Sequence, residues 1–229
     1  MEGVSILKKK ALFVTLIGAS LLTSPAYAGN YTNSDPNANS GYNRTVAKQY
    51  AETYAVYPNS AYFDYTDAGG DCTNFISQVL FHGGLTENKV FSAGGILSGD
   101  IRSWYYDGAD IPLRSKSWTG AHEFRYHWGN VNGNGFNRAY QYKVYTYAEA
   151  YNNFNTIYTD LWPGDIVQYV RSDGLTYHTQ VVHGFSSSDL LVAQHTTNKK
   201  NSYLKQTLAG YAYSDGWLVT YRIKQATNY

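Results

Sequence analysis

The spacing of apolar side chains predicts a helix from about Asn43 to Val56. Apolar residues recur there every three or four positions and form one stripe along a helix. Asn43 or Thr45 would cap the first turn, and Pro58 marks the end. This segment is therefore expected to be an amphipathic helix.

A second helix is predicted from about Cys72 to Phe81, where apolar side chains again share one face. The turn Ala-Gly-Gly at 68–70 leads into it, and the glycine pair at 83–84 terminates it. From about residue 86 to 137 the chain is rich in Gly, Trp, Tyr and Asn and shows little periodicity. Long loops and short helices are expected there, and such loops often carry function.

The C-terminal part alternates apolar and polar residues, which predicts strands. Helices followed by an antiparallel sheet give the order of an α+β fold. No internal repeat and no second domain is visible in the sequence. The predicted strands cover residues 165–171, 177–185, 190–196 and 217–224.

The first 28 residues have the pattern of an export signal. Basic residues Lys8–Lys10 precede an apolar run, Ala11–Leu22, and the small-x-small sequence Ala-Tyr-Ala at 26–28. The run is shorter than the roughly 20 apolar residues of a membrane span. We therefore predict a signal peptide at 1–28, a flexible arm at 29–40 and one domain at 41–229. The alternative is an N-terminal helix of the folded domain.

Composition excludes several classes of protein. The chain has 229 residues, of which 43% are hydrophobic and 15% charged, so charge-driven disorder is not expected. A net charge of +1 lacks the basic excess of a nucleic-acid binder, and no stable membrane insertion is predicted. His122 and His127 would lie on different faces of a helix. A zinc site at these two histidines is therefore not expected.

The single cysteine, Cys72, is placed where a nucleophile would be effective. Exported proteins mostly use cysteine in pairs, so an odd thiol is a candidate reactive group. At the first turn of the predicted helix, the dipole and free N–H groups favour a thiolate and can receive an oxyanion. The alternative is a small core residue on the apolar stripe.

A thiol nucleophile requires a base, and His178 is the leading candidate. If Ser186 and Ser187 centre the hairpin turn, His178 and His195 lie opposite each other on one face of the sheet. A one-residue bulge would substitute Gln194 for His195. Either could hold the base in the required tautomer. The two histidines could equally be a structural cross-strand pair.

The sequence GGDCTNFISQVL at 69–80 resembles the signature of the putative amidase domain family, a group of papain-like secreted bacterial proteins. The similarity spans about residues 41–223. The Pro-Gly-Asp element at 163–165 is shared with the wider NlpC and CHAP-type cell-wall hydrolases. The resemblance implies a papain-like fold in which the helix that carries the cysteine packs on the antiparallel sheet.

The resemblance also assigns roles to residues of the site. Cys72 would be the nucleophile, His178 the base and His195 the orienting group, with Gln194 as its competitor. The papain-type oxyanion glutamine has no counterpart, because that position is Thr66. Possible assistance as third group or oxyanion donor is therefore assigned to Gln194, Asp71 and Asn74.

The function expected from these observations is hydrolysis of an amide bond through an acyl-enzyme. The expected protein is a secreted monomer, cell-wall associated or free, that acts on peptidoglycan or a short peptide without a cofactor. One alternative is a non-catalytic module that binds cell-wall glycan. Another is an acyl- or amide-transferring enzyme, a crosslinker or toxin, on the same scaffold.

Overall fold

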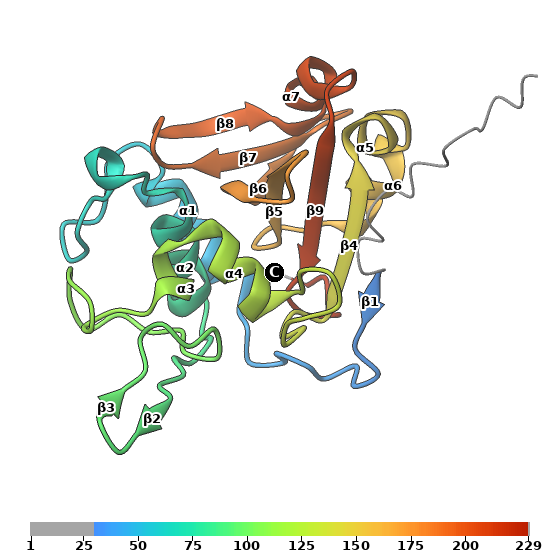
Figure 1. Cartoon of the computed structure of the whole chain (residues 1–229). Helices are drawn as coiled ribbons and strands as arrows, with labels where there is room; N and C mark the ends of the chain where they lie inside the picture. Colours follow the sequence, from blue (N-terminus) through green and yellow to red (C-terminus); the bar gives the residue numbers. More distant parts are fainter. Residues whose placement is uncertain (1–29, 229) are drawn as a thin grey trace, which may run out of the picture.

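The computed structural model describes residues 30–228, and the predicted signal peptide lies outside them. Seven strands form one antiparallel sheet with the order β1-β4-β9-β5-β6-β7-β8 (Figure 1). Helices come first and most strands later, so the predicted α+β class is confirmed. The strands of the sheet are β1 Tyr31–Thr32, β4 Gln141–Thr146, β5 Ile166–Arg171, β6 Thr176–Phe185, β7 Leu190–Gln194, β8 Lys199–Tyr203 and β9 Gly216–Arg222.

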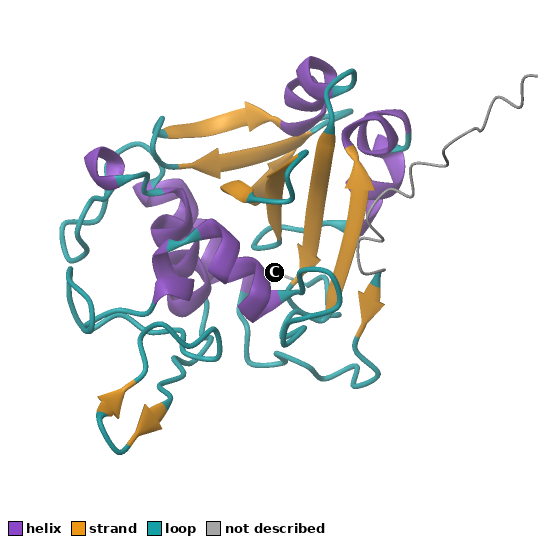
Figure 2. Cartoon of the chain, in the orientation of Figure 1, coloured by secondary structure: helices purple, strands orange, loops and turns teal. Residues whose placement is uncertain are grey.

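Helices cover both faces of this sheet (Figure 2). The alternation of strand side chains assigns neighbouring residues to opposite faces. Ile166 and Val170 of β5 belong to the core under the first helices, whereas Val167 and Tyr169 belong to the core under the later ones. The first set is α1 Arg44–Tyr54, α2 Cys72–His82, α3 Lys116–Thr119 and α4 Ala121–Trp128, and the second is α5 Tyr147–Asn152, α6 Phe154–Asp160 and α7 Leu204–Tyr211.

The two predicted helices are confirmed as α1 and α2. The side chain of Asn43 accepts a hydrogen bond from the amide of Val46 at 3.1 Å, which caps α1 as predicted. The predicted strands correspond to β5, β6, β7 and β9. The sequence patterns did not indicate β4, β8 or the helices α5–α7.

The middle segment contains long loops, α3, α4 and a hairpin of β2 Phe91–Ser92 and β3 Gly95–Ile96. Two buried tryptophans join it to α2. The indole N–H of Trp104 donates to Ser77 Oγ at 3.0 Å, and that hydroxyl donates to the carbonyl of Trp118 at 2.8 Å. The loops are thereby fixed to the helix that begins with the cysteine.

Hydrogen bonds connect residues 30–40, the expected arm, to the domain. Strand β1 pairs with β4, and the side-chain amide of Asn39 donates to the carbonyls of Arg138 and Ile223 at 2.8 and 2.7 Å. Within residues 30–228, no helix has the length and apolar character to cross a bilayer.

A buried ion pair joins α1 to the turn before β5. Arg44 Nη1 lies 2.7 Å from Asp165 Oδ1, and both side chains are 0% exposed. Arg44 also donates to the carbonyls of Pro163, Lys224 and Ala226. Asp165 also accepts the backbone N–H of Ile223. The Pro-Gly-Asp element thus has a structural role, which is to connect the first helix, the sheet and the C-terminal segment.

Candidate active site

Cys72 is the first residue of α2 and is almost fully buried. Burial raises the pKa of its thiol, but hydrogen bonds from His178, Thr73 and the backbone N–H of Thr179, with the charge of His178, outweigh burial and leave the pKa below its ordinary value. The sulfur therefore lies where a thiolate is favoured.

His178 projects from β6 and is partly exposed. Burial lowers the pKa of its imidazole, but the hydrogen bond and charge of Cys72, together with Gln194, raise it overall above the usual value. A lowered thiol pKa beside a raised imidazole pKa is the signature of a thiolate–imidazolium pair. The structure thus brings together Cys72 and His178, which are 106 residues apart in the sequence.

Gln194 fixes the orientation of His178. The Nε2 of His178 lies 3.1 Å from Gln194 Oε1, so this nitrogen carries a proton and donates it. The same amide oxygen accepts from Gln180 Nε2, and Gln194 Nε2 donates to the carbonyl of Thr197. These contacts permit only one orientation of the amide. The Nδ1 of His178 is left for the sulfur of Cys72.

His195 does not face His178, and the predicted pairing of the two histidines is wrong. The hairpin pairs Phe185 with Leu190, which shifts the pairing by two residues from the prediction, and a bulge between Val182 and Gly184 reverses this shift by one. A net change of one residue turns a side chain to the other face of the sheet. Gln194 accordingly takes the position beside His178.

His195 instead forms a buried pair with Asp71. Its Nδ1 lies 2.6 Å from Asp71 Oδ2, and its Nε2 lies 2.7 Å from the carbonyl of Tyr54. The ring stacks on Phe75 with 4.0 Å between centroids. Both side chains are 1% exposed. Asp71 and His195 thus connect the start of α2 to the end of α1.

The side chains of Asp71 and Asn74 are already occupied by protein partners. Asn74 donates to the carbonyl of Phe63 and to Asp71, and its oxygen accepts the indole N–H of Trp118 at 3.0 Å. Neither side chain is placed to donate to an oxyanion. Within the described chain, by contrast, no acceptor reaches the backbone N–H groups of Cys72 and Thr73. These helix-terminal groups are the candidate oxyanion donors.

A hydrogen-bonded row of polar side chains begins at Thr73, next to Cys72. The sequence patterns did not indicate this row. Thr73 and Thr179 are joined through their hydroxyls at 2.9 Å. The amide of Gln168 donates to Thr179 at 3.0 Å and to the carbonyl of Ala121 at 2.9 Å. This row links α2, the sheet and α4. Alternation along β5 and β6 places these residues on the face toward α2, but their partners depend on the tertiary fold.

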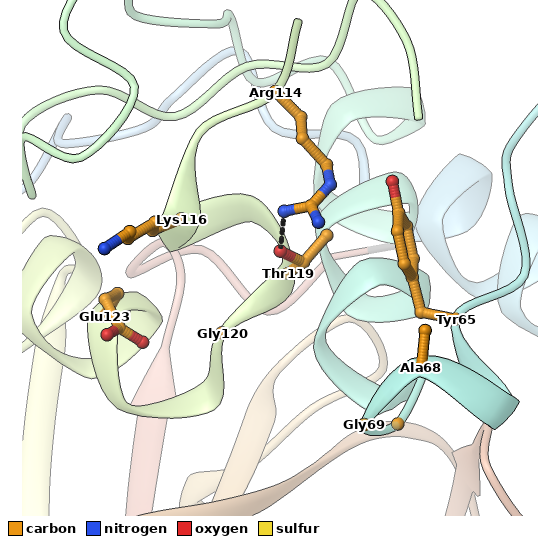
Figure 3. A pocket seen from close by; sticks show the side chains of 9 residues that line it. Tyr65, Ala68, Gly69, Arg114, Lys116, Thr119, Gly120 and Glu123 are labelled. Atoms are coloured by element: carbon orange, nitrogen blue, oxygen red, sulfur yellow. Dashed lines mark hydrogen bonds between the residues drawn. The ribbon is translucent and has the colours of Figure 1, made fainter. Parts of the chain in front are cut away.

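Two polar hollows are associated with the site. One of about 200 Å³ is lined by His178 and Gln194 together with Tyr169, Tyr177 and Tyr211. The other, of about 260 Å³, lies against the Gly69–Gly70 turn just before Cys72 (Figure 3). His122 and His127 line neither, and no metal-binding group of three or more His, Cys, Asp or Glu side chains is found in residues 30–228.

A protein family and two curated proteins are similar to this chain. A model of the family described as Putative amidase domain matches residues 41–219. The uncharacterized protein YjcM of Bacillus subtilis (strain 168) is 29% identical over 164 residues, which are 70% of this chain and 32% of YjcM. The uncharacterized protein YhbB of the same organism is 32% identical over 142 residues, which are 62% of this chain and 37% of YhbB.

The chain spans about a third of the length of these curated relatives. No solved structure matches it with statistical significance.

Proposed function

The chain belongs to the family described as Putative amidase domain, and on that premise we propose that it hydrolyses an amide bond through an acyl-enzyme on Cys72. The observation that carries the proposal is the contact of Cys72 with His178, whose other ring nitrogen is held by Gln194. A family match alone names no nucleophile. This arrangement supports Cys72 as the nucleophile, His178 as its base and Gln194 as the orienting group.

The reaction follows from these positions. The thiolate of Cys72 attacks the amide carbon, and the oxygen of the tetrahedral intermediate is received by the N–H groups at the start of α2. The C–N bond breaks as the imidazolium of His178 gives its proton to the leaving nitrogen. A water then attacks the thioester, His178 takes a proton from it, and the acid product leaves with Cys72 regenerated.

We propose that the substrate is bacterial peptidoglycan or a short peptide and that the protein acts, as a monomer, outside the cell. The support is the export pattern of residues 1–28 and the polar, tyrosine-lined hollow beside His178. Aromatic and hydrogen-bonding side chains together suit peptide or sugar groups.

The test uses chain 29–229 and purified peptidoglycan fragments. New amino groups, with one oxygen from labelled water in each new carboxylate, are the expected products. Cys72→Ala and His178→Ala should abolish these products. Arg102→Ala, which changes an exposed arginine outside the site, should not. If an amine is included in the reaction, products that contain this amine and no labelled oxygen would mean that the enzyme transfers the acyl group to it. Unchanged product formation by Cys72→Ala would overturn the proposed chemistry.

A further inference from the structure

The hollow beside Gly69 and Gly70 has an unusual charged lining. Its other side is formed by Thr119 and Gly120, and Arg114, Lys116 and Glu123 complete the lining. No carboxylate in residues 30–228 forms an ion pair with Arg114 or Lys116. Glu123 also lines the cavity, but neither cationic side chain is in an ion pair with it.

The hollow belongs to the surroundings of the nucleophile. Gly70 is two residues before Cys72, so their Cα atoms are at most about 7.6 Å apart. On the other side, Gly120 precedes Ala121, whose carbonyl is joined through Gln168 to the threonines beside Cys72. A substrate group in this hollow would therefore lie against the turn that leads into Cys72.

Arg114 is held in place before any ligand arrives. Its Nε donates to the carbonyl of Ala109 at 2.7 Å, and its Nη1 donates to Thr119 Oγ1 at 2.7 Å. The guanidinium lies over the ring of Tyr65, 4.6 Å from its centroid. A guanidinium has more N–H groups than these partners use. A preorganised arginine with free donors is the usual partner of a carboxylate.

Glu123 has a separate structural reason for its position. It belongs to the first turn of α4 and folds back over Gly120, where a negative charge complements the helix N-terminus. Figure 3 shows Lys116 and Glu123 on one side of the hollow and Arg114 with Tyr65 on the other. Arg114 is thus the cationic side chain on the side of the hollow away from Glu123.

We propose that this hollow is a substrate subsite in which Arg114 binds a carboxylate group, so that the enzyme selects peptides that carry a free carboxylate close to the scissile amide. The inference rests on the proposed amide hydrolysis at Cys72 and adds the substrate class. Arg114 is a specificity residue in this proposal and takes no part in bond cleavage.

Alkylation of Cys72 tests the subsite without a known substrate. The probes are bromoacetylglycine and bromoacetyl-β-alanine, each paired with its carboxamide, so that only the terminal charge differs. In each case sulfur bonds to the methylene carbon and bromide leaves. We expect the acid to react about 10-fold faster than the amide for at least one tether, and Arg114→Gln to remove most of that preference.

The matched control is Arg102→Gln, which removes an arginine paired with Asp100 outside the hollow and should keep the preference. Because the imidazolium of His178 attracts any anion, the decisive quantity is the change in the acid-to-amide ratio on Arg114→Gln. Arg114→Lys, which keeps the charge and loses the planar fork, should give an intermediate ratio and serves if Arg114→Gln does not fold.

An equal ratio in the parent and in Arg114→Gln, with Cys72 still reactive toward the amides, would overturn the subsite and leave the proposed hydrolysis intact. If Cys72 reacts with every probe no faster than free cysteine, the proposed cysteine chemistry fails. The subsite then falls with it.

Discussion

The imidazole of His195 and the carboxylate of Asp71 are joined by a contact of 2.6 Å inside the protein, away from the base that His195 was expected to orient. The other ring nitrogen faces the carbonyl of Tyr54, which can only accept a hydrogen bond. One proton therefore lies between Nδ1 and the carboxylate. The pair fixes the residue that immediately precedes Cys72 and so holds the start of α2 in place.

Breaking this pair should cost stability before it changes chemistry. Leaving a buried hydrogen-bonding group without its partner typically costs about 1–3 kcal/mol, so Asp71→Asn and His195→Gln should each lower the free energy of unfolding by about that amount. Denaturant unfolding of both single variants and the double variant measures the coupling. A His195→Gln protein of parental stability that has lost activity would instead assign His195 to the catalytic machinery.

Gln194 should control the reactivity of His178. In Gln194→Ala the hydrogen bond to His178 Nε2 is lost, and the imidazole is free to adopt the wrong tautomer or to rotate. We expect turnover of the substrate to fall by 10-fold or more, with little change in KM. Gln194→Asn retains the amide on a shorter side chain and should fall between parent and Ala.

A control for this prediction is Gln206→Ala on α7, an amide side chain outside the polar network around His178. This variant should retain parental turnover. Equal turnover by Gln194→Ala and the parent, with the fold intact, would exclude Gln194 as the positioning residue.

The sequence predicted the positions of Cys72 at the start of a helix and of His178 on a strand, because each depends on local pattern: a glycine turn before a helix, and a strand with alternating polarity. The partner of His178 could not be predicted from local pattern alone. Its identity depends on the exact position of a turn and on one bulge, and a shift of one residue exchanges His195 for Gln194. Apolar periodicity carries no information about either.

The pattern of apolar and polar residues also did not predict contacts between distant segments. Arg44 lies in an amphipathic helix and Asp165 in a turn, and only folding reveals that they are paired and fully buried. The same holds for Arg114, because a guanidinium in a loop looks like any exposed charge until the cavity around it is formed. Core elements were predicted well, whereas polar networks between elements required the structure.

The thiolate form of Cys72 should persist at lower pH than in an ordinary thiol. The pKa of Cys72 is lowered and that of His178 is raised, mainly by one another against the effect of burial. Attack requires the deprotonated thiol, and proton donation to the leaving nitrogen requires the protonated imidazole, so activity depends on both groups. Activity should therefore be bell-shaped in pH.

Iodoacetamide labelling of Cys72 measures the acid limb of this profile directly. In the parent, the labelling rate should remain high well below the free-thiol pKa of about 8.5. In His178→Ala the thiol keeps its burial and loses the imidazolium, so the curve should move to higher pH. Coincident curves for parent and His178→Ala would contradict the thiolate–imidazolium pair.

Breaking the buried ion pair of Arg44 and Asp165 should strongly lower the free energy of unfolding. Arg44→Ala leaves the carboxylate of Asp165 buried without its counter-charge and deprives three backbone carbonyls of their donor. We expect a loss of about 3–5 kcal/mol in the free energy of unfolding, measured by denaturant titration.

The double variant Arg44→Met with Asp165→Asn should lose less than the two single losses combined, because the uncompensated charge is gone. Arg102→Ala, which breaks an exposed pair with Asp100, should leave the unfolding midpoint almost unchanged. A small effect of Arg44→Ala with the fold retained would mean that Asp165 takes up a proton and remains buried as a neutral acid, a state that burial itself favours by raising its pKa.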